Sequence, residues 1–325
     1  MTPDLFRRLV TKARMAPSVH NVQPARWRLA GDTVWLMEDL SVRLPAADPN
    51  GEDAAKSLGA AYEGMVMAAA EEGLGMSYDF VAHPDEGRLR PVARLSFADG
   101  SEPAPLAAYV EARQSWRGAF VDVTAADQET AARLQGVDCA VITDPDAVRI
   151  VAAELNTASF VFTARDDFRA ELLSWMRLRP RHPDWQRDGL NAEAMGLGAF
   201  ERLGASFVLG PLFKPLKACG LARMLLSETS NTSSASAIVV FHRPKDESGF
   251  EAGRAFYRAW LRIEAAGFGA AVLAALADHP PSAKRLAKMV GLSDTRQVVS
   301  AFRIGRRPPD AAFLPARRSV DDLIV

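Results

Sequence analysis

The sequence has 325 residues, of which 48% are hydrophobic and 24% charged, and its formal net charge is −1. This length and apolar content predict a globular protein of about two domains with a large core. The balanced charge argues against a nucleic-acid surface over the whole protein, and no run approaches the roughly 18 consecutive apolar residues of a membrane span.

Signals for secretion and for metal binding are missing from the sequence. The N-terminal segment has no apolar core of signal-peptide length before Arg14, which predicts a cytoplasmic protein. The two cysteines, Cys139 and Cys219, lie too far apart in sequence to suggest a thiol-rich metal site or a disulfide scaffold. Histidines at metal-ligand spacing are lacking, as are Rossmann, P-loop and nucleophile-elbow motifs. We therefore expect no metal, no nucleic-acid partner and no membrane partner.

Helix, hairpin, helix and strand are predicted in this order along residues 1–98. Apolar residues at helical spacing predict an opening helix that ends before Pro17, because proline cannot continue a helix. Gly31-Asp32 separates two short apolar runs, as in a β-hairpin. A long amphipathic helix is predicted over 52–72, and a strand over 91–97 follows it.

The same order recurs near the C-terminus, where a helix is predicted over 251–266 and a strand over 298–304. The two long helices align at a constant offset of 194 residues. This offset matches Gly59 with Gly253, Ala61 with Ala255, Tyr62 with Phe256, and Gly73-Leu74-Gly75 with Gly267-Phe268-Gly269. The recurrence predicts an internal duplication, with chance similarity between two amphipathic helices as the alternative.

Residues 165–235 have no counterpart in the first half. This segment is irregular, is interrupted by Gly and Pro, and carries Trp175 and Trp185. Long segments of this kind in compact proteins are usually lids or binding insertions, so we expect a lid-like insertion here. The strand predicted over 237–241 then resumes the core.

The segment Arg113-Gln114-Ser115-Trp116-Arg117 could cradle a phosphate. In an extended chain, residues spaced by two point to the same side, which brings two guanidinium groups and a hydroxyl together. Arginine can donate two hydrogen bonds to one anion. The alternative is an ordinary basic surface beside a linker.

Two further polar segments are candidates for a binding site. The segment 17–24 places Ser18, His20, Asn21 and Gln23 between two prolines, and these side chains could hydrogen-bond a heteroaromatic ring or a polyol. The tail carries Arg306-Arg307 and Arg317-Arg318. The alternative for segment 17–24 is an ordinary helix-to-strand turn. The alternative for the tail arginines is a basic surface.

Taken together, these motifs resemble those of the FMN-dependent nitroreductase superfamily. The family motif R-x-S-x-R is matched by Arg113, Ser115 and Arg117, and the motif P-S-x-x-N-x-Q-P-W by Pro17, Ser18, Asn21, Gln23 and Pro24, with Ala25 in place of Trp. In an ordinary member R-x-S-x-R comes first, whereas here it comes second. The chain therefore resembles two family units fused together, as in the tandem, Acg-like branch.

The resemblance implies an α+β fold of three αβα layers with mixed, mainly antiparallel sheets. The duplication would let one chain mimic the homodimer of the family, so we expect a monomeric pseudo-dimer or a homodimer. The implied units are a degenerate first half over 1–98, a linker over 99–112 and a second half over 113–325.

One FMN per chain is implied, bound between the halves, while the mirror-related site lacks its motif and should be inactive. The residues implied to bind FMN are Arg113, Ser115, Arg117, Pro17, Ser18, His20, Asn21, Gln23, Leu273, Ala274, Gly305, Arg317 and Arg318. Among these, Leu273 and Ala274 would lie near flavin N5. Because N5 carries the hydride, no catalytic side chain is implied.

The implied activity is transfer of hydride from NAD(P)H through FMN to a small organic acceptor, such as a nitroaromatic, a quinone or an enone. The first alternative is a flavin-storage protein whose lid blocks the nicotinamide. A specialised flavin reaction is the second alternative, and a degenerate relative without flavin is the third.

Overall fold

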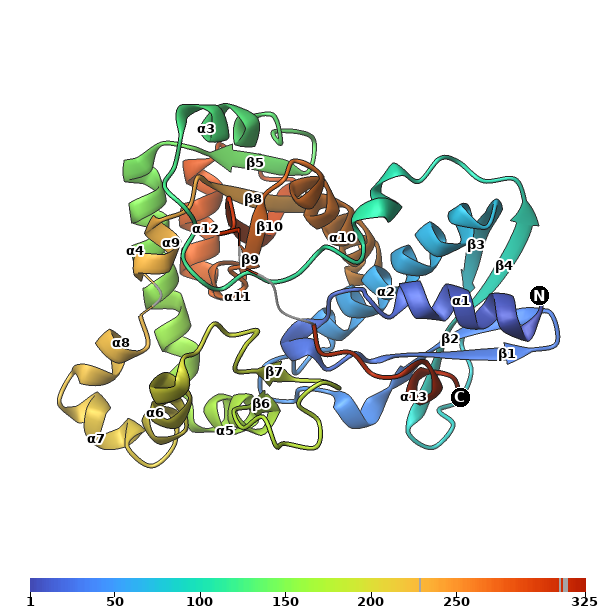
Figure 1. Cartoon of the computed structure of the whole chain (residues 1–325), viewed down its shortest axis with the longest axis horizontal. Coiled ribbons are helices and arrows are strands. Elements are labelled where there is room, and N and C mark those ends of the chain that lie inside the picture. Colours follow the sequence, from blue (N-terminus) through green and yellow to red (C-terminus); the bar gives the residue numbers. More distant parts are fainter. Residues whose placement is uncertain (228, 310, 312–314) are drawn as a thin grey trace.

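The computed structural model describes residues 1–325 except 228, 310 and 312–314. Each half of the molecule is built on a four-stranded antiparallel sheet (Figure 1). The first half contains α1 (Pro3–Ala13), β1 (Ala25–Ala30), β2 (Thr33–Asp39), α2 (Glu52–Glu71), β3 (Leu74–Phe80) and β4 (Leu89–Asp99). The second half contains α3 (Ala125–Ala132), β5 (Cys139–Ile142), β8 (Ala237–Pro244), α10 (Gly249–Ala265), β9 (Gly269–Val272) and β10 (Arg296–Gly305).

A large insertion separates β5 from β8, and short helices complete the chain. The insertion contains α4 (Pro145–Thr163), α5 (Asp166–Trp175), β6 (Met176–Arg177), β7 (Leu190–Asn191), α6 (Ala199–Leu209), α7 (Phe213–Ala218), α8 (Leu221–Leu225) and α9 (Thr229–Ser233). The remaining elements are α11 (Ala275–Asp278), α12 (Pro280–Met289), α13 (Val320–Leu323) and the 3-10 turns η1 (Val19–Asn21), η2 (Leu40–Val42) and η3 (Pro105–Tyr109).

The two sheets have the same topology. The strand order is β1-β2-β4-β3 in the first sheet and β5-β8-β10-β9 in the second. In both, the long helix follows the second strand of the sheet, and the last strand in sequence lies inside the sheet. The predicted α+β class with antiparallel sheets is confirmed, and the matching topology agrees with an internal duplication.

The two long helices, α2 and α10, end where the sequence predicts. Glycines in the left-handed region follow both, since φ is 75° at Gly73 and 79° at Gly267. Glycine adopts this conformation without the steric cost of a Cβ atom, which makes it a common helix terminator. At the start of α10, the Ser248 side chain accepts a hydrogen bond from the Glu251 amide at 3.2 Å.

Close packing of α2 against α10 joins the halves. A Cβ atom on Gly59 would lie 1.9 Å from the Phe250 carbonyl oxygen, and one on Gly253 would lie 2.0 Å from the Lys56 carbonyl oxygen. The offset of 194 residues maps Gly253 onto Gly59 and Phe250 onto Lys56. Reciprocal contacts of this kind are the mark of a twofold interface, so the halves pack as two subunits of a dimer would.

Each half also extends a segment to the sheet of the other half. After β4 the chain crosses to the second half, where Ser115 forms a parallel bridge with Ala270 of β9. After β10 the tail returns to the first half, where Ile324 bridges Trp27 of β1. These exchanged segments place Arg113 and Arg317 at the junction of the halves.

Three apolar clusters form most of the core. The cluster of the first half joins α1, α2 and its sheet, and includes Phe250, Tyr257 and Leu261 of α10. The second sheet packs against two clusters, one shared with α4, α11 and α12 and the other with α3 and α10. The second half therefore has helices on both faces of its sheet, as the predicted three layers require.

The insertion differs from the sequence prediction in extent and in structure. It begins after Ile142, earlier than the predicted 165–235, and α4 occupies its first part. Helices α5 to α9 fill much of the segment that we expected to be irregular. Among the described residues no single helix is long and apolar enough to cross a membrane, and one pair bent by 97°, α4 with α5, meets those criteria of length and composition.

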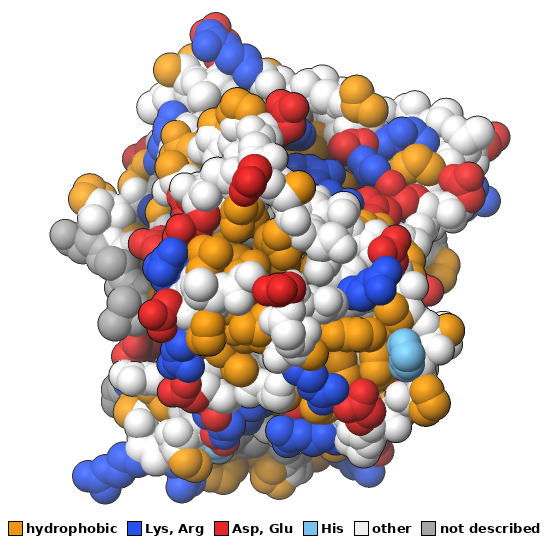
Figure 2. Space-filling view, turned by 90° about the vertical axis from the view of Figure 1, so that its right-hand side faces the viewer, with side chains coloured by type: hydrophobic (Ala, Val, Ile, Leu, Met, Phe, Trp, Pro, Cys, Tyr) orange, Lys and Arg blue, Asp and Glu red, His pale blue; other side chains and the backbone are white. Residues whose placement is uncertain are grey.

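The first half forms the face shown in Figure 2. Apolar, basic and acidic side chains are interspersed on it, and its upper part is hollowed. The sheet strands of this half carry exposed ion pairs, such as Arg94 with Asp79 at 3.3 Å. Exposed pairs of this kind contribute little to stability.

Candidate functional site

The segment between Pro17 and Pro24 has an unusual backbone. The φ angles of His20, Asn21 and Gln23 are 44°, 56° and 53°, all in the left-handed region although none is glycine. The Ser18 hydroxyl accepts a hydrogen bond from the Gln23 amide at 2.9 Å, which closes the turn. Such conformations cost roughly 1–3 kcal/mol each and cluster at functional sites. The strain marks this loop as a candidate site.

Two side chains of this loop hold the insertion in place. Gln23 donates from Nε2 to the Arg187 carbonyl at 2.9 Å, and its Oε1 accepts from the Arg318 amide at 2.9 Å. Asn21 donates from Nδ2 to the Gly189 carbonyl at 3.2 Å. The loop thus connects the insertion to the C-terminal tail.

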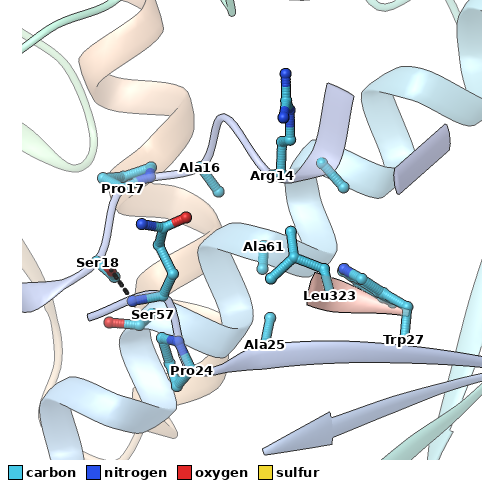
Figure 3. A pocket seen from close by; sticks show the side chains of 12 residues that line it. Arg14, Ala16, Pro17, Ser18, Pro24, Ala25, Trp27, Ser57, Ala61 and Leu323 are labelled. Carbon is cyan, nitrogen blue, oxygen red and sulfur yellow. Dashed lines mark hydrogen bonds between the residues drawn. The ribbon is translucent and has the colours of Figure 1, made fainter. Parts of the chain in front are cut away.

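A small cavity of about 20 Å³ lies beneath the loop (Figure 3). Ser18, Ala25, Trp27, Ser57 and Ala61 are among its lining residues. A volume of this size holds about one water molecule. This cavity is therefore too small for an organic cofactor.

Two arginine side chains meet at the C-terminal end of α1. The Met15 carbonyl oxygen accepts from Nη2 of Arg113 at 2.7 Å and from Nη2 of Arg317 at 3.2 Å. Arg317 also donates from Nη1 to Oδ1 of Asn21 at 3.0 Å. The Arg113 guanidinium lies 4.5 Å from the centre of the Trp260 ring. The exchanged segments and the loop thus converge at one place between the halves.

Carboxylates balance the charge of these arginines only weakly, because Glu264 acts on Arg113 from beyond ion-pair distance. Neither Arg113, Arg317 nor the neighbouring Arg14 forms an ion pair with an acidic side chain in the part of the chain that the structure describes. Burial lowers the pKa of Arg113, and burial together with the charge of Arg113 lowers the pKa of Arg317 to about 9. The Nε atoms of all three are buried without a hydrogen-bond partner.

Burying cations without a counterion is costly, because hydrogen bonds to neutral groups replace only part of the lost hydration. An anion with several acceptor oxygens would replace it, since guanidinium groups bind phosphate and carboxylate through paired hydrogen bonds. We call Arg14, Arg113 and Arg317 the arginine cluster. The guanidinium groups of this cluster are suited to bind a phosphate group.

His20 of the strained loop is influenced by the charge of Arg117. Burial, and then the charge of Arg117, lower the pKa of His20 to about 4. His20 is therefore neutral near pH 7. Its Nδ1 atom is buried without a hydrogen-bond partner, so it can accept or donate a bond to a ligand. An edge contact with Phe168 of the insertion, 6.3 Å between ring centres, orients the imidazole.

The adjacent tail arginines Arg317 and Arg318 have different partners in the structure. Arg318 donates from Nη2 to Oδ2 of Asp188 at 2.6 Å, and Arg177 donates to Oδ1 of the same carboxylate at 2.7 Å. Arg318 is therefore ion-paired with Asp188, and this pair links the tail to the insertion. Of the adjacent pair, only Arg317 joins the arginine cluster.

Several further residues of the expected site have different surroundings. Ser115 lies beside Ala270 at the edge of the second sheet. Leu273 is buried in the core, whereas its neighbour Ala274 is exposed. A Cβ atom on Gly305 would lie 2.4 Å from Cγ of Phe120, so packing against that ring accounts for the glycine.

Sequence reasoning missed three members of the site: Arg14, the Met15 carbonyl and Trp260. Arg14 lies three residues before Pro17, and a basic charge so close to the loop is a usable signal. A backbone carbonyl leaves no trace in the sequence. Trp260 belongs to the apolar stripe of α10, and only the fold shows that Arg113 lies over it.

No family model matches the sequence. A segment of 118 residues is 30% identical to the Mycobacterium tuberculosis protein named "Putative NAD(P)H nitroreductase Rv3131", covering 36% of this chain and 34% of that protein. The chain thus matches about a third of the length of this curated relative. The match supports the resemblance to nitroreductases over that segment.

Comparison with solved structures gives, among others, the FMN and NADPH-dependent nitroreductase NfnB from a Sphigopyxis species. It is 16% identical, covers 68% of this chain and 98% of its own, and has a TM-score of 0.36. A "putative nitroreductase" from Anabaena variabilis is 10% identical, covers 94% of this chain and 88% of its own, and has a TM-score of 0.42.

Proposed function

We propose that this chain binds one FMN between its two halves and acts as a nitroreductase-like oxidoreductase. It would pass hydride from NAD(P)H to a small organic acceptor, such as a nitroaromatic, a quinone or an enone. The observation that carries this proposal is the arginine cluster, a partly buried positive site that lacks a carboxylate ion pair and lies beside a strained loop. The names of the similar proteins support FMN and NAD(P)H as the cofactors.

The arginine cluster would hold the phosphate of FMN, with Ser115 and Arg117 on the same exchanged segment. Ser18 and His20, in the strained loop, would contact the rest of the flavin. When bound, the flavin supplies the electron chemistry, and the protein binds and orients it. Unit boundaries at 98 and 112, and a monomeric or homodimeric state, belong to the same proposal.

Riboflavin offers a direct test, because it has the flavin ring and ribityl chain of FMN but lacks the phosphate. Binding is measured by the shift of the visible flavin absorption band during titration. We expect FMN to bind at least about 100-fold more tightly than riboflavin, since several charge-assisted hydrogen bonds of about 1.5–3 kcal/mol each are lost. Equal affinities, or no binding of FMN, would contradict the proposal.

Flavin storage is a second candidate, and the contacts of the insertion favour it. The insertion is tied to the loop through Gln23 and Asn21 and to the tail through Asp188. Ties of this kind could keep the site covered. Mixing the FMN-loaded protein with NADPH without oxygen distinguishes the two candidates. Rapid bleaching of the flavin band supports the oxidoreductase, and a band that stays oxidised supports storage.

A further inference from the structure

A second site lies at the junction of the halves, apart from the arginine cluster. It is a groove of about 790 Å³ between α2, β3, the linker after β4 and α10. Pockets for small organic ligands have volumes of about 300–1,000 Å³. The groove is lined, among others, by Val66, Met67, Leu74, Met76, Arg258 and Arg262. We call it the linker groove.

The twofold relationship explains why the linker groove is open. The offset of 194 residues maps Val66 onto Trp260 and Glu63 onto Tyr257. In the second half these two rings pack against Arg113, whose guanidinium lies 4.5 Å from the Trp260 ring and 5.7 Å from the Tyr257 ring. Around Val66 and Glu63 the corresponding space is a groove.

A second difference between the halves keeps this side from closing. Gly64 allows α1 to pack tightly, because a Cβ atom there would lie 3.2 Å from Cα of Ala13. Its counterpart at the offset of 194 is Arg258, whose long side chain lines the linker groove instead. The linker groove therefore occupies the position at which the other half packs Arg113 against two aromatic rings.

The charges of the groove limit the class of ligand. Nη1 of Arg258 lies 2.8 Å from Glu63, which also accepts from Nε of Arg254 at 2.9 Å. Arg262 is exposed one helical turn further along and forms no ion pair with the residues that the structure describes. The guanidinium group of Arg262 is thus available to a ligand that contacts the apolar side chains of the groove. Asp99 and Glu102 on the linker also line the groove. They repel anions, and the repulsion is greater for a polyanion than for a single carboxylate.

We propose that the linker groove binds an amphipathic organic monocarboxylate, with its carboxylate on Arg262 and its apolar body against Val66, Met67 and Met76. A guanidinium group binds a carboxylate through paired hydrogen bonds, and burial of the apolar body supplies the remaining affinity. The ligand is distinct from FMN, and the proposal stands independently of flavin binding.

The test uses 2-naphthoate and its uncharged counterpart, 2-naphthamide. Their affinities are measured by equilibrium dialysis against the full chain, with and without excess FMN. The proposal predicts the same probe affinity in both conditions. Three variants are compared with the unaltered protein: Arg262→Ala removes the cation, Val66→Trp fills the groove with the residue of the other half, and Arg133→Ala removes an exposed arginine beside α3 as a control. Circular dichroism and the melting temperature establish that each variant is folded.

We expect Arg262→Ala to weaken naphthoate binding at least about tenfold and to leave naphthamide binding unchanged within about twofold. Val66→Trp should weaken the binding of both probes, and Arg133→Ala should weaken neither. No binding of naphthoate to the unaltered protein overturns the proposal. Binding that neither Arg262→Ala nor Val66→Trp weakens also overturns it, because the probe is then bound elsewhere.

Discussion

The two halves share a strand order and a reciprocal helix contact, yet the two sites at their junction differ. On one side the strained loop and the exchanged segments bring Arg113 and Arg317 onto the Met15 carbonyl, and a buried positive site results. On the other side Arg258 and Arg262 line an open groove. Packing between duplicated units can therefore persist while the segments that lie over it diverge.

The largest effect is expected where the second half departs most from the first, at the insertion. Asp188→Ala leaves Arg177 and Arg318 buried without their shared carboxylate, which should destabilise the protein by about 3–5 kcal/mol. Urea unfolding measures the change. Asp167→Ala, which removes an exposed pair with Arg165 on the same insertion, should have little effect on the unfolding free energy. Equal effects of the two variants would refute a buried link between insertion and tail.

The strained loop gives a prediction on pH. Because the pKa of His20 is lowered to about 4, the unfolded chain takes up more protons than the folded protein between about pH 4 and 6.5. Stability contributed by neutral His20 is therefore present above about pH 6.5 and lost as the pH falls toward 4, by up to about 3 kcal/mol. His20→Asn, which tolerates the left-handed backbone, should flatten this dependence. An unchanged pH profile of the unfolding free energy would contradict the assignment.

The helix pair tests the twofold relationship itself. Gly59→Ala and Gly253→Ala each place a Cβ atom against a carbonyl oxygen of the other helix, so each should destabilise the protein by about 2 kcal/mol. Gly204→Ala on α6 is the matched control, because its Cβ atom would have no neighbour within 4 Å. Thermal unfolding of the three variants measures the effect. A strong loss at only one of the two helix-pair glycines would argue against reciprocal packing.

Local signals in the sequence predicted many of the elements. Gly73 and Gly267 marked the ends of both long helices, and Gly31-Asp32 marked the hairpin between β1 and β2. The strand β3 was missed, although Leu74, Met76, Tyr78 and Phe80 alternate as a strand requires. This strand begins directly after Gly73, where the helix-terminating glycine is the stronger local signal.

The site could be predicted only in part, because its geometry depends on contacts between distant segments. The loop and the R-x-S-x-R segment stand out as polar or basic sequence. Adjacent residues such as Arg317 and Arg318 look equivalent, yet only the fold shows that Asp188 pairs with Arg318. The linker groove has no motif, since it arises from the absence of a side chain like Arg113 over Val66.

The number of FMN molecules bound per chain distinguishes one flavin site from two, and it is compared among the unaltered protein, Arg317→Ala and Arg262→Ala. The protein is titrated with FMN, and free flavin is separated and measured by its visible absorption. We expect one FMN per chain, an affinity about ten- to a hundredfold weaker in Arg317→Ala, and an unchanged affinity in Arg262→Ala. Two FMN per chain, or equal losses in both variants, would contradict the claim that only one of the two related sites holds the flavin.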